Sequence, residues 1–233
     1  MDPASRPLVA LNAVTKVYPR GAVSIRALAG VALEIARGEF VAIMGPSGSG
    51  KSTLLSILGC LDRPSGGEYW LDGQPVAGLE DQALSRIRNR SIGFVFQSFH
   101  LIHELTVLEN AQTPLLYGGV AEHDWPARAQ ACLERVGIAH RAGHRPSELS
   151  GGEAQRAAIA RALVMEPHVI LADEPTGNLD TATGDEIAAL LEDLHREGRT
   201  IILVTHNEAL AARARRTVRL RDGRIDSERS RPA

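Results

Sequence analysis

The segment Gly45–Thr53 constrains this sequence more than any other, because its residues match the pattern G-x-x-x-x-G-K-[ST]. The apolar run Phe40–Met44 precedes it and is typical of a buried strand. Ser52–Leu61 follows, with apolar residues at helical spacing. A strand, a glycine-rich loop and a helix in this order predict a phosphate-binding loop, or P-loop. The alternative is a glycine-rich turn that only joins a strand to a helix.

In a P-loop, backbone N–H groups and the positive end of the helix dipole surround phosphate oxygens. Lys51 is predicted to reach the β- and γ-phosphates of a nucleotide, and the Ser52 hydroxyl is predicted to bind Mg²⁺. Among 26 basic residues only Lys16 and Lys51 are lysines, so one of two compact ammonium groups stands here. Nucleotide contacts are predicted along the whole segment: Gly45, Pro46, Ser47, Gly48, Ser49, Gly50, Lys51, Ser52 and Thr53.

Net charge, cysteine count and hydropathy exclude several classes of protein. A formal net charge of −2 gives no overall field that would attract nucleic acid. The two cysteines, Cys60 and Cys132, make no disulfide framework and favour a reducing compartment. The sequence has no signal-peptide pattern and no apolar run of about 20 residues, the length that spans a membrane. We therefore expect a cytoplasmic protein that acts at a membrane only through a partner. A C-terminal arginine cluster is interrupted by acids, which favours a solvated face.

Sequence patterns predict an α/β chain with an N-terminal antiparallel sheet and an inserted helical part. Strands are predicted at 8–18, 26–35, 40–44, 66–73, 92–96, 169–172 and 200–204, with a hairpin at 218–225. Helices are predicted at 52–61, 80–90, 105–116, 125–136, from 151 onward, and 185–196. A polar loop is predicted at 140–146 and a disordered tail from 227.

Two carboxylates, Asp173 and Glu174, follow the apolar run 168–172. In P-loop proteins an acid at the end of such a strand completes the Mg²⁺ site, which predicts that role for Asp173. A second carboxylate one residue later lies close to an attacking water, so Glu174 is predicted to act as the general base. The alternative is that the two acids only cap the next turn.

A second glycine turn, Ser150-Gly151-Gly152-Glu153, opens a predicted helix and could also bind an anion through Ser150 and exposed N–H groups. Alone it could be an ordinary helix cap. Together with the P-loop, the run Leu149–Glu153 resembles the LSGGQ or LSGGE signature of the ATP-binding-cassette (ABC) ATPases. The resemblance covers about Leu8–Ile225 and has the motifs in the family's order.

The resemblance implies further site residues. Tyr18 matches the aromatic residue that stacks on adenine. Gln97 matches the glutamine that contacts Mg²⁺ and the attacking water and faces the membrane subunit. Asp180 matches a residue that crosses the dimer interface, and His206 matches the histidine that contacts the γ-phosphate. Each could instead be an ordinary structural or solvated residue.

The resemblance also implies a fold and partners. The expected fold is an ABC nucleotide-binding domain: a P-loop NTPase (RecA-like) core with a β subdomain at 8–97 and 166–225, a helical subdomain at 98–165, and a tail at 226–233. The implied cofactors are ATP and Mg²⁺. Two copies would pack head to tail, so that the P-loop of one and Ser150–Glu153 of the other enclose each ATP. Integral membrane permease subunits are the other implied partners, and no nucleic acid is expected.

Three stretches, together with the run 173–180, are similar to a narrower group, the lipoprotein-releasing, macrolide-exporting and cell-division-type subunits. The stretches are 57–62, 92–97 with 99–101, and 105–110 with 114–115. Three hypotheses remain: the ATPase of an exporter or mechanotransmission complex, the ATPase of an importer, and a soluble ABC ATPase acting on nucleic acid or ribosomes. The sequence departs from the family's pattern at His103 and Ala154, which affects only the expected partner contacts.

Overall fold

The structure is a computed structural model that describes residues 6–21 and 23–231. The chain divides into two compact units. The first unit is built from the ranges Met1–Ser85 and Gly198–Ala233, and the second is Arg86–Glu197. The helix α2 (Asp81–Ser91) contains the sequence boundary between the first range and the second unit.

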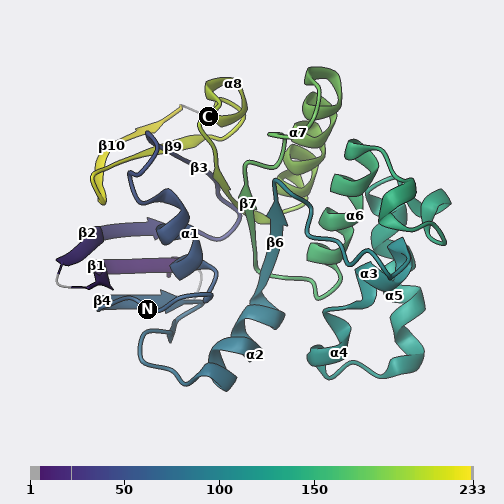
Figure 1. The fold of residues 1–233 in the computed structure, drawn as a ribbon, viewed down its shortest axis with the longest axis horizontal. Helices are drawn as coiled ribbons and strands as arrows, with labels where there is room; N and C mark the ends of the chain where they lie inside the picture. Colours follow the sequence, from purple (N-terminus) through teal and green to yellow (C-terminus); the bar gives the residue numbers. More distant parts are fainter. Residues whose placement is uncertain (1–5, 22, 232–233) are drawn as a thin grey trace. The chain divides into compact units, whose positions relative to one another are not determined.

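An antiparallel sheet with the strand order β2-β1-β4-β5 belongs to the first unit (Figure 1). Its buried side chains include Leu11, Val14 and Leu28, which are inaccessible to solvent. A two-residue turn, Asp72-Gly73, joins β4 to β5, and both residues have positive φ as a tight hairpin requires. The predicted antiparallel sheet and Asp-Gly turn are therefore confirmed. The strands are β1 (Val9–Arg20), β2 (Val23–Ile35), β4 (Gly66–Leu71) and β5 (Gln74–Pro75).

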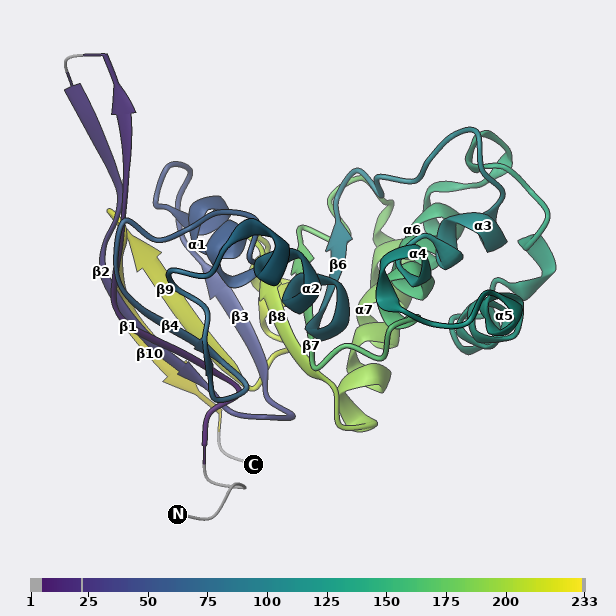
Figure 2. The same ribbon diagram turned by 90° about the horizontal axis from the view of Figure 1, so that it is seen from below.

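Figure 2 shows β1 and β2 continuing as a two-stranded ribbon beyond the rest of this sheet. Two apolar side chains on the ribbon, Val23 and Ile25, are exposed.

A second group of strands in the first unit has the order β10-β9-β3-β8. The central strand β3 pairs in parallel with β8 and β9, and every residue of β3 and β8 is buried. Continuous apolar runs are typical of parallel strands that are covered on both faces. Here α1 lies against β8 and β2, and α8 lies against β3. These elements are β3 (Phe40–Met44), β8 (Thr200–Val204), β9 (Arg216–Arg221), α1 (Lys51–Leu58) and α8 (Glu208–Ala211).

The expected disordered tail from 227 is wrong for residues 227–230. They belong to β10 (Arg224–Ser230), which pairs with β9 in an antiparallel hairpin. Residues 227–230 are all polar, so they lack the apolar alternation by which strands are recognised. Backbone pairing extends it instead, and Arg216 on β9 forms an ion pair of 2.6 Å with Glu228 on β10.

Two arginines of the C-terminal cluster, Arg216 and Arg219, form ion pairs with acids. Arg216 also pairs with Glu39 at 3.1 Å, and Arg219 pairs with Glu208 at 2.7 Å. These pairs fit the predicted solvated face, and the expectation that nucleic acid is not a partner stays a prediction.

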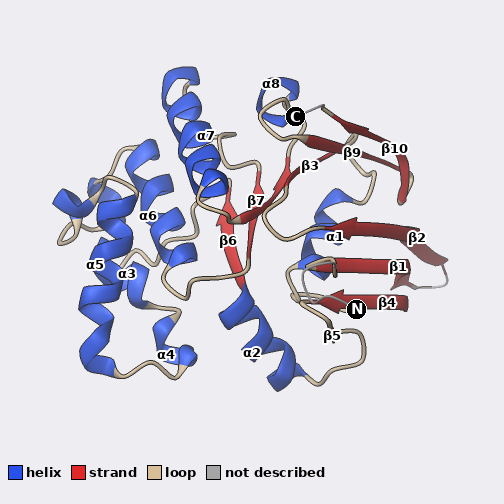
Figure 3. Cartoon of the chain, turned by 180° about the vertical axis from the view of Figure 1, so that it is seen from behind, coloured by secondary structure: helices blue, strands red, loops and turns tan. Residues whose placement is uncertain are grey.

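The second unit contains the parallel pair β6 (Ile92–Phe96) and β7 (Val169–Asp173). The helix α6 (Gly151–Leu163) packs on β6 and on α7 (Thr181–Arg196), and Figure 3 shows these helices in blue. Both strands were predicted. The helix α7 begins four residues before its predicted start because Asp180 caps it there.

Two further helices of the second unit, α3 (Val107–Gln112) and α5 (Trp125–Arg135), pack with α6, and the short α4 (Leu115–Gly118) follows α3. The predicted single helix 105–116 is wrong. Capped by Thr106, α3 begins two residues later than predicted, and Pro114 interrupts the helix because proline lacks an N–H donor and clashes with the preceding turn. The predicted polar loop 140–146 contains parts of two short 3₁₀ turns, 139–141 and 146–148. The subdomain boundaries stay a prediction.

Candidate nucleotide-binding site

The P-loop Gly45–Thr53 runs from the end of β3 into α1 and is held closely by its neighbours. A Cβ atom on Gly45 would lie 2.2 Å from the Leu220 carbonyl oxygen, and one on Gly50 would lie 2.5 Å from the Ala27 carbonyl oxygen. Real Cβ atoms do not approach backbone so closely, so only glycine fits at both positions. The Gly223 N–H, in the β9–β10 turn, also donates to the Ser49 carbonyl oxygen at 2.9 Å.

The loop presents hydrogen-bond donors that suit phosphate. Lys51 Nζ donates to the carbonyl oxygens of Gly45 (2.7 Å) and Pro46 (2.9 Å). An ammonium has three N–H groups, so the third can donate to a phosphate oxygen. The helix α1 has no side-chain cap, and its first turn carries backbone N–H groups that the helix itself cannot satisfy. Within the described chain, the buried hydroxyl of Ser49 has no hydrogen-bond partner. A bound phosphate would satisfy such donors, so the residues fit the predicted nucleotide.

The remaining predicted P-loop residues are accessible. Pro46, Ser47 and Gly48 are exposed at the tip of the loop, and Ser52 is exposed in the first turn of α1, where its hydroxyl could bind a cation. Thr53 is half-buried. In the described chain no three His, Cys, Asp or Glu side chains cluster as metal ligands.

His206 lies in the same unit as the P-loop. It follows β8, which runs parallel to β3, with Ile43 opposite Val204. The pairing continues one residue further, where the Thr205 N–H donates to the Ile43 carbonyl oxygen at 3.2 Å. Because parallel strands end at the same edge, His206 is carried to the edge from which the P-loop starts. The His206 side chain is exposed.

Tyr18 lies near the end of β1, with 37% of its surface exposed. Its hydroxyl donates to Asp62 Oδ2 at 2.7 Å. Burial and the Asp62 carboxylate raise the pKa of Tyr18, whereas a hydrogen bond with Thr53 acts in the opposite direction. The contact with Thr53 joins the predicted base-stacking residue to the P-loop helix.

In the second unit, Asp173 ends β7 and Glu174 follows it. Phe96 at the end of β6 lies opposite Asp173, so Gln97 and the two acids leave the same edge of a parallel pair. Glu174 has φ of 43°, in the left-handed region that a residue with a Cβ adopts only at a cost. Its carbonyl oxygen accepts from the Gly177 N–H at 2.9 Å. Such backbone conformations are concentrated at functional sites, where the surrounding structure enforces them.

Gln97 and Asn178 form a reciprocal pair across 81 residues of sequence. Gln97 Nε2 donates to Asn178 Oδ1 at 2.9 Å, and Asn178 Nδ2 donates to the Gln97 carbonyl oxygen at 3.1 Å. A Cβ atom on Gly177 would lie 2.7 Å from Gln97 Nε2, so a side chain there would displace the glutamine. The predicted metal- and water-contacting residue is thus bound to the loop that leads to Asp180.

The turn Ser150–Glu153 is the N-terminus of α6 and contains a capping box. Ser150 Oγ accepts from the Glu153 N–H at 3.3 Å, and Glu153 Oε2 accepts from the Ser150 N–H at 2.8 Å. Arg141 Nε donates to Glu153 Oε1 at 2.8 Å. The Ser150 N–H and the Arg141 guanidinium lower the pKa of Glu153 to about 2. Gly152 packs so closely on α7 that a Cβ would lie 2.4 Å from Thr183 Cγ2.

The low pKa of Glu153 predicts a pH dependence of stability. A carboxyl group whose pKa falls on folding stabilises the fold above its unfolded pKa of about 4.3, and this stability is lost as the pH drops toward the folded value. At pH 7 we expect Glu153→Gln to lower the free energy of unfolding by about 1–2 kcal/mol. The difference from the parent protein should shrink between about pH 5 and pH 2 in urea titrations. A difference that stays constant over this range would contradict the prediction.

Asp180 is the N-cap of α7. Its carboxylate accepts from the Thr183 hydroxyl at 2.6 Å and from the Thr183 N–H at 3.0 Å. These two bonds lower the pKa of Asp180, whose side chain is exposed. The residue is thereby fixed at the surface as an anion, and its predicted role at a dimer interface stays a prediction.

Sequence reasoning missed two side chains that support these loops, the buried Gln155 and the half-buried Arg161. Gln155 Nε2 donates to the Pro175 carbonyl oxygen at 2.7 Å, which ties α6 to the segment after Glu174. Arg161 donates to the carbonyl oxygens of Phe99 (2.8 Å) and His100, two residues with positive φ that follow Gln97. A glutamine and an arginine among the alanines of α6 were the available signals.

The P-loop geometry defines the class of protein: a nucleotide-binding protein whose loop and helix N-terminus receive phosphate. The family model described as "ABC transporter" matches residues 28–177. The chain therefore belongs to the ABC transporter family, and it is an ATP-binding ATPase domain of that family with the expected α/β P-loop fold. No helix in the described part of the chain has the length and apolar character needed to cross a membrane.

Two relatives illustrate the likeness. The "Macrolide export ATP-binding/permease protein MacB 1/2" of Paracoccus denitrificans is 51% identical over 98% of this chain, which spans only 34% of that protein. An "Uncharacterized ABC transporter ATP-binding protein" of Thermotoga maritima is 53% identical, and 91% of each chain is covered. This chain thus spans about a third of the macrolide export relative and nearly all of the other. The resemblance to the macrolide-exporting group is confirmed at this level.

A solved structure of an ATP-binding cassette is also similar to this chain. The "Dimeric structure of a post-hydrolysis state of the ATP-binding cassette MJ0796 bound to ADP and Pi" has a TM-score of 0.88 and 45% sequence identity. The alignment covers 97% of this chain and 99% of that one.

Proposed function

We propose that this chain hydrolyses ATP to drive an ABC exporter or mechanotransmission complex in a membrane. The observation that carries the proposal is the P-loop, in which Lys51, the buried Ser49 hydroxyl and the first turn of α1 converge as donors. A donor set of this kind is suited to the phosphate chain of a nucleotide. The 51% identity to a macrolide export protein supports the exporter over the importer.

The hydrolysis step divides among residues of both units. Lys51 neutralises charge on the β- and γ-phosphates, and His206 contacts the γ-phosphate. Ser52, Gln97 and Asp173 would hold Mg²⁺, which would supply positive charge to neutralise the phosphates when bound. Few protein ligands suffice, because Mg²⁺ in such sites keeps several waters and phosphate oxygens. Glu174 accepts a proton from water as the water oxygen bonds to the γ-phosphorus and the bond to the ADP oxygen breaks.

The complete site requires a second copy of this chain. Ser150–Glu153 forms a capped helix N-terminus in the second unit, and such a terminus attracts an anion. In the proposed head-to-tail dimer it closes over ATP on the partner's P-loop, and Asp180 crosses the interface. The dimeric cassette bound to ADP and Pi, at 45% identity, supports this arrangement. Closure on ATP and opening after hydrolysis would then produce motion.

The motion is proposed to act on permease subunits in the membrane, with this chain at the cytoplasmic face. The name of the relative from Paracoccus denitrificans, "Macrolide export ATP-binding/permease protein MacB 1/2", combines ATP binding and a permease in a single protein. This combination supports a permease partner for the present chain. Gln97 is the proposed residue that faces it. Neighbouring reading frames would separate the alternatives: a four-span protein with a large extracytoplasmic domain supports the exporter, and a solute-binding protein supports the importer.

Lys51→Ala tests the proposed nucleotide site. The variant loses the ammonium that contacts the phosphates, and we expect ATP affinity to fall about tenfold or more, since a charge-assisted hydrogen bond contributes about 1.5–3 kcal/mol. Calorimetric titration with ATP and Mg²⁺ measures the affinity, and phosphate release measures the rate. Arg37→Ala is a matched control, because Arg37 is an exposed cation of the same unit that pairs with Asp72. Unchanged affinity and rate in the Lys51 variant would refute the site.

A further inference from the structure

The second lysine of the chain, Lys16, has no part in the proposed hydrolysis, yet its surroundings are specific. It lies on β1 with only 12% of its side chain exposed. Lys16 Nζ donates to Asp62 Oδ1 at 2.5 Å and to the Arg63 carbonyl oxygen at 2.8 Å. Both acceptors belong to the segment that follows α1. The ammonium therefore fixes β1 to the end of the P-loop helix region.

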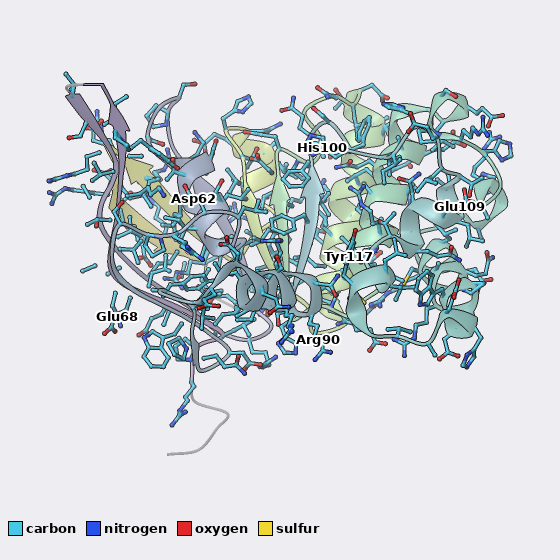
Figure 4. The ribbon with its side chains drawn as sticks, turned by 60° about the horizontal axis from the view of Figure 1, so that its bottom comes forward. Asp62, Glu68, Arg90, His100, Glu109 and Tyr117 are labelled. Atoms are coloured by element: carbon cyan, nitrogen blue, oxygen red, sulfur yellow. The ribbon has the colours of Figure 1, made fainter. Side chains whose placement is uncertain are left out.

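The same contacts reach Tyr18. Lys16 Nζ lies 4.8 Å from the centre of the Tyr18 ring, within the range of a cation–π interaction. Asp62 is shared, because its Oδ1 accepts from Lys16 and its Oδ2 accepts from the Tyr18 hydroxyl at 2.7 Å. Figure 4 labels Asp62 beside α1. Desolvation raises the pKa of Asp62, but the hydrogen bonds from Lys16, Tyr18 and the Arg63 N–H outweigh it, so the carboxylate stays ionised.

Geometry explains why a lysine stands here in a chain that otherwise uses arginine. The three donors of an ammonium can point in different directions, whereas a guanidinium presents its donors in one plane. Here the cation serves a carboxylate, a backbone carbonyl and an aromatic face at once. The two lysines of the sequence thus both occupy positions where a compact charge is needed.

We propose that Lys16 and Asp62 are positioning residues that hold the Tyr18 ring ready to stack on the base of the bound nucleotide. The inference rests on the proposed role of Tyr18. Asp62 fixes the hydroxyl and Lys16 covers one face of the ring, which leaves the other face for the base. A ring ordered in advance loses less rotamer freedom on binding. The cation also reduces the negative potential of the ring, so two π faces repel each other less.

The competing explanation is a purely structural ion pair that ties β1 to the segment after α1. The two explanations predict different effects on the affinity for a ligand that has phosphates but no base. A positioning role changes the affinity for ATP but not for inorganic tripolyphosphate, which occupies the P-loop alone. A structural role changes both or neither.

The experiment is calorimetric titration of Lys16→Met and the parent chain with ATP and with tripolyphosphate. We expect Lys16→Met to weaken ATP binding about two- to fivefold, as a cation–π contact of 0.5–1 kcal/mol predicts, and to leave tripolyphosphate binding unchanged. Asp62→Asn should behave alike, because it removes the charge while keeping the side chain's size. Lys16→Arg should recover only part of the loss. Equal loss with both ligands, or no loss with ATP, would overturn the proposal.

Tyr18→Ala separates this inference from the function on which it rests. We expect about tenfold weaker ATP binding, since base–aromatic stacking contributes about 1–3 kcal/mol, and no further loss when Lys16→Met is added. If Tyr18→Ala binds ATP normally, the stacking role itself fails. If it binds weakly while Lys16→Met binds normally, only the positioning role fails.

A matched control is Asp72→Asn. Asp72 accepts from Arg37 at 2.5 Å, the same distance as in the Lys16–Asp62 pair, but both side chains are exposed and the pair joins the β4–β5 turn to the segment before β3. The control should bind ATP like the parent chain. Melting temperatures of all variants check that each is folded when its affinity is measured. If the affinity for ATP falls as much in Asp72→Asn as in Asp62→Asn, the proposal is overturned.

Discussion

Glu174→Gln is expected to bind ATP normally and to hydrolyse it about 100- to 10,000-fold more slowly, the range that a general base contributes. The amide has nearly the size of the carboxylate but cannot accept the proton from water. The backbone at Glu174 is held at φ 43°, and glutamine adopts that conformation at a similar cost, so the fold should be kept. With hydrolysis blocked, ATP should hold two copies together. Phosphate release and size-exclusion chromatography with ATP and Mg²⁺ measure the two effects.

Glu186→Gln is the matched control for this variant. Glu186 is an exposed carboxylate of α7 in the same unit, paired with Arg156 at 2.9 Å, and lies outside every proposed catalytic role. We expect Glu186→Gln to hydrolyse ATP at the parental rate and to form no dimer that persists after the ATP is hydrolysed. Near-normal hydrolysis by Glu174→Gln would remove Glu174 from its proposed role.

Local sequence was enough to predict much of the fold. The strands β3 and β8 are buried and almost entirely apolar, and their bounds match those predicted from the sequence. The Asp72-Gly73 turn follows from the need for positive φ at both positions. In each case one physical preference dominates within a few residues, so the local pattern decides the structure.

Elements whose structure depends on distant partners were not predictable in the same way. The polar residues 227–230 form a strand only because β9 supplies a pairing edge, and the helix predicted through Pro114 breaks at that residue. For the site, motif order identified Gln97 but not its partner Asn178, because the pair is separated by 81 residues. Motif order identified Tyr18 too, whereas its connection to Asp62 across 44 residues required the fold.

The predicted site residues form two groups in the structure. The P-loop, Tyr18 and His206 belong to one unit, and the signature turn, Gln97, the two acids and Asp180 belong to the other. Each group has its own internal hydrogen bonds, such as the Gln97–Asn178 pair and the Ser150–Glu153 capping box. Within the second group, only the signature turn and Asp180 are proposed to act at the partner's ATP, so these residues are the ones that test assembly.

Ser150→Arg tests whether assembly involves a second chain. In the proposed dimer this side chain faces ATP held by the partner's P-loop, so a large cation should block closure and reduce turnover by about 100-fold or more while each P-loop still binds ATP. The substitution also removes the N-cap of α6, which costs about 1 kcal/mol of stability. Thr106→Arg controls for that loss, because Thr106 forms the same capping box at α3. The control should keep parental turnover, measured as phosphate release.

Mixing two inactive variants gives the sharper measurement. Ser150→Arg keeps an intact P-loop, and Lys51→Ala keeps an intact signature turn, so a mixed dimer contains one complete site. Random pairing of equal amounts makes half of the dimers mixed, and we expect turnover to recover to about a quarter of the parental value if the sites act independently. Full activity of Ser150→Arg alone, or turnover by a protein shown to be monomeric, would contradict a site divided between two chains. Recovery on mixing requires that the signature turn of one chain complete the P-loop site of the other, because neither variant supplies both halves.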